Sequence, residues 1–321
     1  MIEISVIVVA FNHMKYIRQA MDSFVGQKTD FDYEIIVHDD CSTDGTAEIV
    51  REYAEKYPDK VIPILQEENQ YSKGLDVVRE YVFPKCRGRF IAFCEGDDYW
   101  CDEYKLQKQF DFLNSHPDYS ACVHNTMFID AFNGSETLRN ACTVEKDITM
   151  EDVIPAGSVE YHMSSLIYRR EYMYRPDAYK AKRIGDYPRA LYLCSVGKMH
   201  YLPDVMSVHR VNVEGSWTSK NVGSDDAAKQ VAHYRKLNAM LEKVDDATEK
   251  KYHDLIVKTM RWNECIILQW QDNAKKILKD YQDVYRSMSR SEKGKILIKA
   301  YFPHLFKALN HVRINMRRRK I

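Results

Sequence analysis

The stretch ISVIVVA at residues 4–10 decides the fold of this chain. It is a nearly continuous apolar run of strand length, which is typical of a strand covered on both faces in a parallel sheet. After a polar break at Asn12, apolar residues recur at helical spacing from Ile17 to Val25. A second run, YEIIVH at residues 33–38, predicts another buried strand. The chain therefore begins with strand, helix and strand.

The same alternation continues along the next part of the sequence. Further strands are predicted at residues 61–65 and 90–94, and further helices at residues 47–57, 75–83 and 104–115. Strands and helices that alternate in this way predict a mostly parallel, doubly wound α/β sheet. Beyond it we expect short strands at residues 120–124, 164–168 and 205–211, and a helix at residues 186–196. Residues 1–222 should form this α/β domain, and residues 223–321 a helical region.

The charge of the chain is balanced in total but unevenly distributed. The 321 residues include 47 Lys or Arg and 47 Asp or Glu, so the formal net charge is zero. Residues 247–321 hold 18 basic and 7 acidic side chains, a net of +11, which leaves −11 for the rest. A hydrophobic fraction of 45% argues against disorder. No apolar run reaches the roughly 18 residues of a membrane span and no signal-peptide pattern opens the chain, so we expect a cytoplasmic protein.

Acidic residues follow two of the predicted strands, at the ends where parallel sheets bind ligands. HDDCSTDGT at residues 38–46 contains Asp39 and Asp40, and EGDDYW at residues 95–100 contains Glu95, Asp97 and Asp98. Neighbouring carboxylates repel each other unless a cation or hydrogen-bond donors meet them. Mg²⁺ and Mn²⁺ prefer carboxylate and diphosphate oxygens. The second cluster therefore predicts a divalent-metal site that holds a diphosphate.

Each motif also has a structural interpretation. Ser42 and Asp44 are good helix-capping residues. The aromatic pair Tyr99-Trp100 can stack on a sugar or base, or belong to the core. Asp186, in RIGDYP at residues 183–188, can be a functional acid or one that interacts with the dipole of the helix that follows.

Two enzyme classes are disfavoured by missing glycine-rich loops. No GxGxxG follows the first strand and no GxxxxGK[ST] occurs, which argues against dinucleotide oxidoreductases and P-loop enzymes. A phosphatase of the haloacid dehalogenase type needs an aspartate two residues before the Asp-Gly-Thr aspartate. Ser42 stands there, so this interpretation fails.

In their order and spacing these motifs resemble the family 2 glycosyltransferases of the GT-A fold. The resemblance covers about residues 1–220 and is carried by Ala10-Phe11-Asn12, HDDCSTDGT, EGDDYW and the GDYP that begins at Gly185. It implies an inverting transfer of a sugar from a nucleotide-diphosphate donor, preferably a UDP-sugar, with Mn²⁺ or Mg²⁺ as cofactor. The acceptor would be a glycan or a lipid-linked molecule in surface polysaccharide biosynthesis.

The resemblance also assigns roles to individual residues. Asp186 takes the place of the general base, and Asp98, assisted by Asp97, that of the metal ligand. The nucleotide would contact Ala10, Phe11, Asn12, Asp39, Asp40 and Asp97. The donor or acceptor would contact Glu95, Tyr99, Trp100, His209, Asn212 and Trp217. Asn212 stands where the family often has a histidine, and His209 is the candidate substitute.

Two other functions stay open from the sequence. A sugar nucleotidyltransferase shares an α/β architecture but normally has a glycine-rich loop after its first strand, where this chain has Phe11-Asn12-His13-Met14. The second alternative is a module that binds a sugar nucleotide or a glycan but has no catalytic activity. The joint presence of Asp40, Asp97, Asp98 and Asp186 argues against it.

The end of the chain is basic. Residues 292–321 contain nine Lys or Arg and one acid, and Leu305, Leu309 and Val312 lie at helical spacing. A basic amphipathic helix binds anionic membranes, so we expect this segment at the cytoplasmic face of a membrane. The alternative is a helix packed on the protein. Nothing resembles a nucleic-acid-binding module, and the oligomeric state is open.

Overall fold

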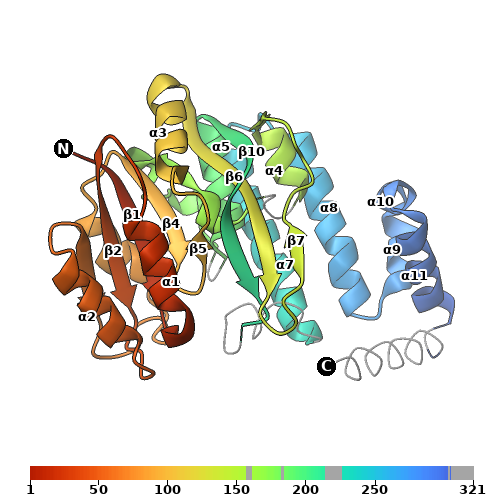
Figure 1. Ribbon diagram of the computed structural model, residues 1–321. Coiled ribbons are helices and arrows are strands. Elements are labelled where there is room, and N and C mark those ends of the chain that lie inside the picture. Colours follow the sequence, from red (N-terminus) through yellow and green to blue (C-terminus); the bar gives the residue numbers. More distant parts are fainter. Residues whose placement is uncertain (157–160, 182–183, 214–225, 303, 305–321) are drawn as a thin grey trace. The chain divides into compact units, whose positions relative to one another are not determined.

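The computed structural model describes residues 1–156, 161–181, 184–213, 226–302 and 304. The chain forms two compact units (Figure 1). The first comprises Met1–Asp177 and Gly185–Lys220, and the second comprises Ala178–Ile184 and Asn221–Ile321. Each unit has its own elements and core.

One mixed sheet with the strand order β3-β2-β1-β4-β9-β6-β10-β5 forms the centre of the first unit. β1 pairs in parallel with β2 and β4, and β2 pairs in parallel with β3. β9 is antiparallel to both of its neighbours, β4 and β6, whereas β6 and β10 are parallel to each other. The strands on this path are β1 (Ile2–Ala10), β2 (Asp32–Asp39), β3 (Val61–Leu65), β4 (Phe90–Glu95), β5 (Tyr99–Trp100), β6 (Tyr119–Asp130), β9 (Ile167–Arg169) and β10 (Lys198–Val211). Because β9 is antiparallel to both β4 and β6, these two strands run in the same direction. The strands that share this direction are β1, β2, β3, β4, β6 and β10.

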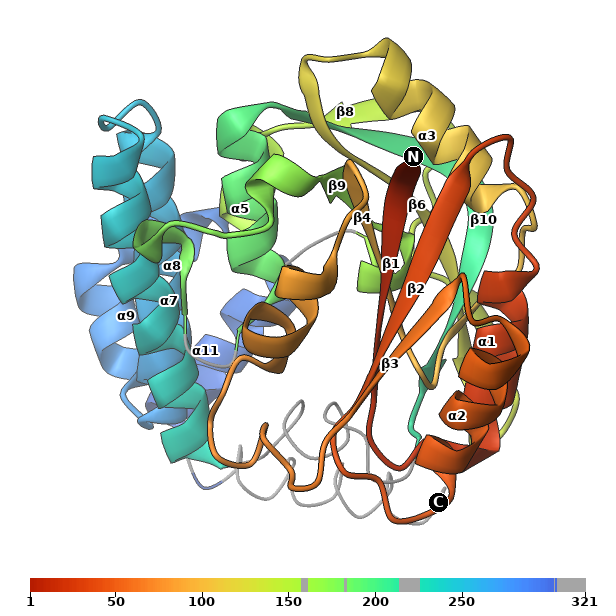
Figure 2. The ribbon, with the colours of Figure 1, turned by 90° about the vertical axis from the view of Figure 1, so that its left-hand side faces the viewer.

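Two further strands extend the sheet, and helices cover its faces. β7 (Glu136–Leu138) pairs with β6, and β8 (Lys146–Ile148) pairs with β10. Figure 2 shows α1 (Met14–Val25) and α2 (Thr46–Lys56) together on one face of β1, β2 and β3. Among the described residues of this unit, the other α-helices are α3 (Lys105–Ser115), α4 (Met150–Ala156) and α5 (Asp186–Val196). The predicted alternation of strands and helices in this part of the chain is therefore confirmed.

The helix predicted at residues 75–83 is wrong in type. The structure has a single π-helical turn, η1 (Val78–Val82), and then a 3₁₀ turn, η2 (Phe83–Lys85). Pro84 lies inside the second turn, and it has no backbone N–H to donate to a preceding carbonyl. The periodic apolar pattern therefore marks a buried face without specifying an α-helix.

The core of the first unit forms on both sides of β1, as its continuous apolar run predicts. Ile4, Val6 and Val8 are fully buried on one face of β1, where they share a cluster with Ile17 and Phe24 of α1, and Ile7 is fully buried on the other face. Burying such side chains contributes about 1.5–3 kcal/mol each. The strand that opens the chain is thus the centre of the packing.

In the second unit, residues 226–302 consist of helices and short connections, as predicted, whereas Ala181 and Ile184 form an isolated antiparallel bridge. It contains α7 (Ala227–Ala247), α8 (His253–Trp270), α9 (Ala274–Asp280), α10 (Gln282–Ser287) and α11 (Arg290–Tyr301). Ile296 and Ala300 of α11 are buried in a cluster with Cys265 and Ile277. The basic segment expected to bind membranes therefore begins with a helix that packs into this unit. None of the helices in the described ranges is long and apolar enough to cross a membrane.

α3 opens with a buried lysine. Lys105 is fully buried; its Nζ donates to Gln109 Oε1 at 2.8 Å and lies 4.2 Å from the centre of the Trp100 ring. Gln109 in turn donates to the carbonyls of Cys122 and Ser165, at 2.8 and 2.9 Å. Burial lowers the pKa of Lys105 to about 7.

This shifted pKa predicts that Lys105→Met changes the pH dependence of stability. Between about pH 7 and 10 the unfolded chain holds a proton on Lys105 that the folded protein does not, so the wild-type free energy of unfolding rises with pH. The contribution is about 1.4 kcal/mol per pH unit. The Lys105→Met variant lacks it, so urea denaturation at pH 7, 8 and 9 should show its relative stability falling as pH rises. Lys108→Met, at an exposed position of α3, is the control; equal slopes in wild type and Lys105→Met would contradict the prediction.

Candidate active site

The strand register brings the predicted motifs to one edge of the sheet. Ala10 at the end of β1 pairs with Asp39 of β2, and Val9 pairs with Glu95 of β4. β1 thus lies between the two acidic strand ends. β10 runs in the same direction, so His209 near its end reaches the same edge.

The loops after β1 and β2 are joined by hydrogen bonds. Asn12 N donates to Ser42 Oγ at 2.8 Å, and its Oδ1 accepts from Thr43 N at 2.9 Å. Met14 N, in the first turn of α1, donates to Asp44 Oδ2 at 2.9 Å. Asn12 has a left-handed φ of 56°, a conformation that Asn tolerates better than most residues. Asp44 also accepts from Thr46 N at 3.0 Å, so Ser42 and Asp44 have capping and bracing roles both within their own loop and across the two loops.

Asp39 and Asp40 hold backbone groups of neighbouring loops. Asp39 Oδ2 accepts from Ser42 N at 2.9 Å. The two carboxylate oxygens of Asp40 accept from Gln70 N at 2.8 Å and Tyr71 N at 3.0 Å. These donors offset the negative charges that the sequence places side by side. A carboxylate oxygen can accept more than one hydrogen bond, so Asp40 keeps acceptor capacity for a ligand.

The aromatic candidates at this edge differ in exposure. Phe11 is 42% exposed at the end of β1, so its ring can contact a ligand. Trp100 is 3% exposed, and its ring packs against Phe24 and below Lys105, with centroid distances of 4.7 and 4.2 Å. Trp100 is thus a core residue and no longer a candidate for sugar contact. Tyr99 is half-buried, and the guanidinium carbon of Arg210 lies 4.7 Å from the centre of its ring.

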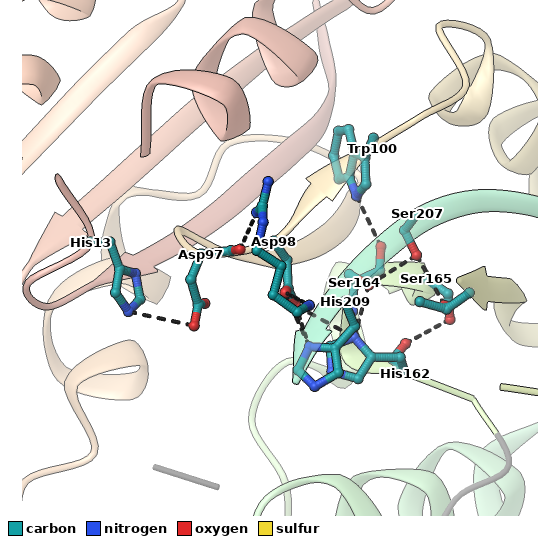
Figure 3. Close-up of polar contacts among 11 residues, drawn as sticks. His13, Asp97, Asp98, Trp100, His162, Ser164, Ser165, Ser207 and His209 are labelled. Carbon is teal, nitrogen blue, oxygen red and sulfur yellow. Dashed lines mark hydrogen bonds and ion pairs between the residues drawn. The ribbon is translucent and has the colours of Figure 1, made fainter. Parts of the chain in front are cut away.

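β5 positions the acidic cluster. It pairs antiparallel with β10, Tyr99 opposite Val208, so the preceding Asp98 lies opposite His209. The fully buried Asp98 carboxylate accepts from His209 Nδ1 at 2.9 Å and from Arg210 N at 2.9 Å (Figure 3). The predicted Asp98 and His209 are thus brought into contact.

A second histidine, which the sequence patterns do not indicate, completes this cluster. The His162 ring stacks on that of His209, with ring centres 3.8 Å apart, and its Nδ1 lies 3.7 Å from Asp98 Oδ2 (Figure 3). Ser164 Oγ lies 2.8 Å from the same Nδ1 and donates to Ser207 Oγ at 2.9 Å. His162 is therefore held in place from the strand that carries His209.

Two overlapping groups of side chains fit a divalent metal. One is Asp98 with His162 and His209, and the other is Asp98 with Glu95 and Asp97; in each, the ligand atoms lie within 4.8 Å of one another. Carboxylates suit Mg²⁺ and Mn²⁺, and imidazole favours Mn²⁺ and the later transition metals. The residues present therefore fit the predicted cofactor.

The carboxylates of the cluster repel one another. Burial raises the pKa of Glu95 well above its usual range, and the charges of Asp97 and Asp98 raise it further. Burial also raises the pKa of Asp98, although the His209 hydrogen bond opposes the shift. His162 is held neutral, because burial lowers its pKa well below the usual value. His13 Nε2 stands 3.7 Å from Asp97 Oδ2, and a divalent cation would offset the remaining repulsion.

Asp186 is the first residue of α5 and is open to solvent. In the part of the chain that the structure describes, no hydrogen-bond donor contacts its carboxylate. The protein atoms around it displace water and raise its pKa, and the charges of Arg189 and Arg175 oppose this shift. Its negative charge also raises the pKa of Glu95, so the two carboxylates are close enough to interact electrostatically.

The last two candidates do not join the cluster. Asn212, with a left-handed φ of 58°, donates from Nδ2 to Asp130 Oδ2 at 2.8 Å. Its amide is therefore engaged at the end of the β6–β10 pair, and His209 occupies the position beside Asp98. Trp217 lies outside the described residues.

Comparisons with known proteins agree with this geometry. The model of the family described as "Glycosyl transferase family 2" matches residues 5–175. An uncharacterized protein of Mycobacterium tuberculosis is 32% identical over 215 residues, which is 67% of this chain and 60% of that protein. TuaG of Bacillus subtilis, a putative teichuronic acid biosynthesis glycosyltransferase, is 36% identical over 110 residues, 34% of this chain and 41% of its own. TarS of Staphylococcus aureus, a poly(ribitol-phosphate) β-N-acetylglucosaminyltransferase, is 36% identical over 119 residues, 36% of this chain and 20% of its own.

Solved structures share the fold. Residues 1–349 of TarS in complex with UDP-GlcNAc give a TM-score of 0.58 at 21% identity, covering 93% of this chain and 79% of that one. The mannosyltransferase PcManGT of Pyrobaculum calidifontis, in complex with GDP-Man and Mn²⁺, gives 0.52 at 16% identity, covering 97% and 87%.

The chain belongs to glycosyl transferase family 2, whose model matches more than half of its residues. It has the GT-A fold, as expected from the sequence. It spans about 60% of the length of the mycobacterial relative.

The cluster geometry predicts that Asp98→Asn weakens Mn²⁺ binding by roughly tenfold or more. The substitution removes the charge that both groups of potential ligands share. Titration of free Mn²⁺ by electron paramagnetic resonance measures the affinity. Asp111→Asn, at an exposed position of α3, controls for the loss of one negative charge. Wild-type affinity in Asp98→Asn would contradict the assignment.

Proposed function

We propose that this protein is an inverting, metal-dependent glycosyltransferase that moves a sugar from a nucleotide-diphosphate donor to a glycan or lipid-linked acceptor. The proposal rests mainly on the presence of two acidic sites with different surroundings in the same unit. The buried Asp98 cluster suits a metal-bound diphosphate, and Asp186 offers a solvent-accessible carboxylate without a protein donor in the described ranges.

Asp186 is proposed as the general base. Direct displacement at the anomeric carbon requires that the acceptor hydroxyl lose its proton as the new bond forms. A carboxylate whose pKa is raised above the usual value by its surroundings is a better proton acceptor than an ordinary one. The charges of the neighbouring arginines limit this rise and favour the ionised form, which is the form that accepts a proton.

The Asp98 cluster is proposed to hold the donor diphosphate. A divalent cation at this site would neutralise the charge that develops on the departing nucleoside diphosphate. Asp98 would bind the cation together with Glu95 and Asp97 or with the two histidines. The hydrogen bonds from His162 to Ser164 and from Ser164 to Ser207 orient the His162 imidazole. The leaving group needs no proton, so a second acid is not required.

The nucleotide is proposed to lie along the ends of β1 and β2. Phe11 offers an exposed ring to a base, and Asp40 and Asn12 line the adjoining loops. Preference for UDP is supported by the UDP-GlcNAc complex of TarS, and PcManGT shows that the same fold also accepts GDP-Man. The names of TuaG and TarS support a role in the biosynthesis of a surface polymer.

Asp186→Asn should reduce sugar transfer by about a hundredfold or more and leave Mn²⁺ and UDP binding nearly unchanged. In the wild type, activity should fall as the pH decreases through the pKa of Asp186, because only the carboxylate accepts a proton. Donor consumption and calorimetric UDP binding measure the two effects, with Asp111→Asn as the control. Loss of nucleotide binding with transfer retained would contradict the role of Asp186.

We also propose that residues 303–321 contact an anionic membrane. This segment holds six Lys or Arg and no acid. Of its residues, only His304 is among those that the structure describes. α11 packs into the helical unit through Ile296, so only the segment after it is assigned this role.

A chain that ends at Phe302 should lose binding to anionic liposomes, since all six of these positive charges are removed and α11 is kept. Co-sedimentation with vesicles of phosphatidylcholine and phosphatidylglycerol, compared with pure phosphatidylcholine, measures the effect. Equal sedimentation of the full-length and shortened chains would remove the membrane hypothesis.

A further inference from the structure

The charges of Arg189 and Arg175 act on Asp186, and the ring of Tyr168 packs against Arg189, but none of these three residues belongs to the proposed donor site. Arg189 is 7% exposed, and no hydrogen-bond acceptor in the described structure contacts its Nη1. Tyr161 and Tyr168 are 3% and 0% exposed, and their hydroxyl groups are likewise buried without a partner among the described residues. Buried polar groups are nearly always hydrogen-bonded, so the unpartnered atoms of Arg189 and Tyr168, whose side chains pack together, need an explanation.

These residues are placed by three different elements. Arg189 follows Asp186 by three positions on α5, so both side chains lie on the same face of the helix. The guanidinium carbon of Arg189 lies 4.9 Å from the ring centre of Tyr168, a residue of β9. Arg175 Nη1 donates to the carbonyl oxygen of Gly185 at 2.7 Å, directly before the base.

Neither arginine forms an ion pair in the described part of the structure. The charges of Asp76 and Asp186 act on Arg175, but no carboxylate of the described residues lies within ion-pair distance of either guanidinium. A buried charge such as that of Arg189 is ordinarily paired. Burial and the positive charge of Arg189 lower the pKa of Arg175 to about 10. The pKa of Tyr168 is raised by burial, and the charges of both arginines oppose this shift. An anion beside them would offset the mutual repulsion and accept from the free donors.

We propose that Arg189 and Arg175, with the hydroxyl of Tyr168, bind an oxyanion carried by the acceptor, either a phosphate or a carboxylate. The inference rests on the proposed role of Asp186 as the base. Arg189 lies one helical turn from Asp186. When an acceptor hydroxyl lies against Asp186, a group a few bonds away in the same acceptor can therefore reach Arg189. A guanidinium recognises phosphate and carboxylate with the same planar set of donors.

The acceptor is favoured over the donor as the source of this anion. The donor diphosphate is accounted for by the cluster around Asp98, which belongs to the ends of β4 and β10. Arg175 and Arg189 instead adjoin Gly185 and Asp186, the residues that an attacking hydroxyl must approach. A neutral polyol or sugar in this place could accept hydrogen bonds from the guanidinium groups, but it would leave their positive charge uncompensated.

Direct binding of small anions tests the proposal on the full-length protein. Calorimetry with methyl phosphate and with glucuronate should show binding to the wild type, and the tighter of the two identifies the anion of the acceptor. Arg189→Gln should weaken this binding at least tenfold. Arg51→Gln, at an exposed position of α2, removes the same charge and should bind as the wild type does. No binding of either anion to the wild type, or equal binding to Arg189→Gln, would overturn the proposal.

Tyr168→Phe tests the site without risk to the fold. It removes a hydroxyl that has no partner in the described structure, so the melting temperature should stay the same or rise, whereas anion binding should weaken several-fold. A fall in melting temperature with unchanged anion binding would show that water satisfies the hydroxyl, and would contradict the proposal.

Repeating the titration with UDP and Mg²⁺ present separates acceptor from donor. Unchanged anion binding is expected if the site belongs to the acceptor, and competition by UDP would assign the arginines to the donor and overturn the inference. These titrations contain no donor sugar, so their failure leaves the test of Asp186 as the base unaffected. Conversely, an inactive enzyme that binds methyl phosphate through Arg189 would refute the proposed function alone.

Discussion

The antiparallel pairing of β5 with β10 is the constraint on which the candidate site depends. Only two residue pairs form it, Tyr99 with Val208 and Trp100 with Ser207. They are enough to bring Asp98 against His209, 111 positions later in the chain. The buried Trp100 indole, whose Nε1 donates to Ser164 O at 2.9 Å, anchors the same short strand to the turn after His162. One short ladder thus brings together the candidate metal ligands from three distant segments.

Charges of opposite sign gather in different parts of the first unit. Acidic side chains cluster where a cation and a diphosphate would bind, and the charges of Arg189 and Arg175 act on the proposed base. Asp186 interacts with both groups, because its charge raises the pKa of Glu95 and the charge of Arg189 opposes the rise in its own pKa. The formal net charge of zero therefore conceals local excesses of both signs.

Sequence patterns predicted the parallel half of the sheet well, because an apolar run such as residues 4–10 must be buried on both faces. They also placed Asp98 and Asp186 correctly at strand and helix ends. They missed His162, whose role depends on β9 running antiparallel between two distant strands. The aromatic pattern at Trp100 was ambiguous, and packing against Phe24 shows that it is core.

Donor turnover by the purified full-length chain tests the central claim most directly. Release of nucleoside diphosphate would be measured across a panel of UDP-, GDP- and thymidine-diphosphate sugars with Mn²⁺, with and without excess chelator. The account predicts that at least one donor is consumed and that the chelator abolishes its consumption. Binding of nucleotide sugars without turnover of any of them would contradict it, and would instead indicate a binding module built on the same fold.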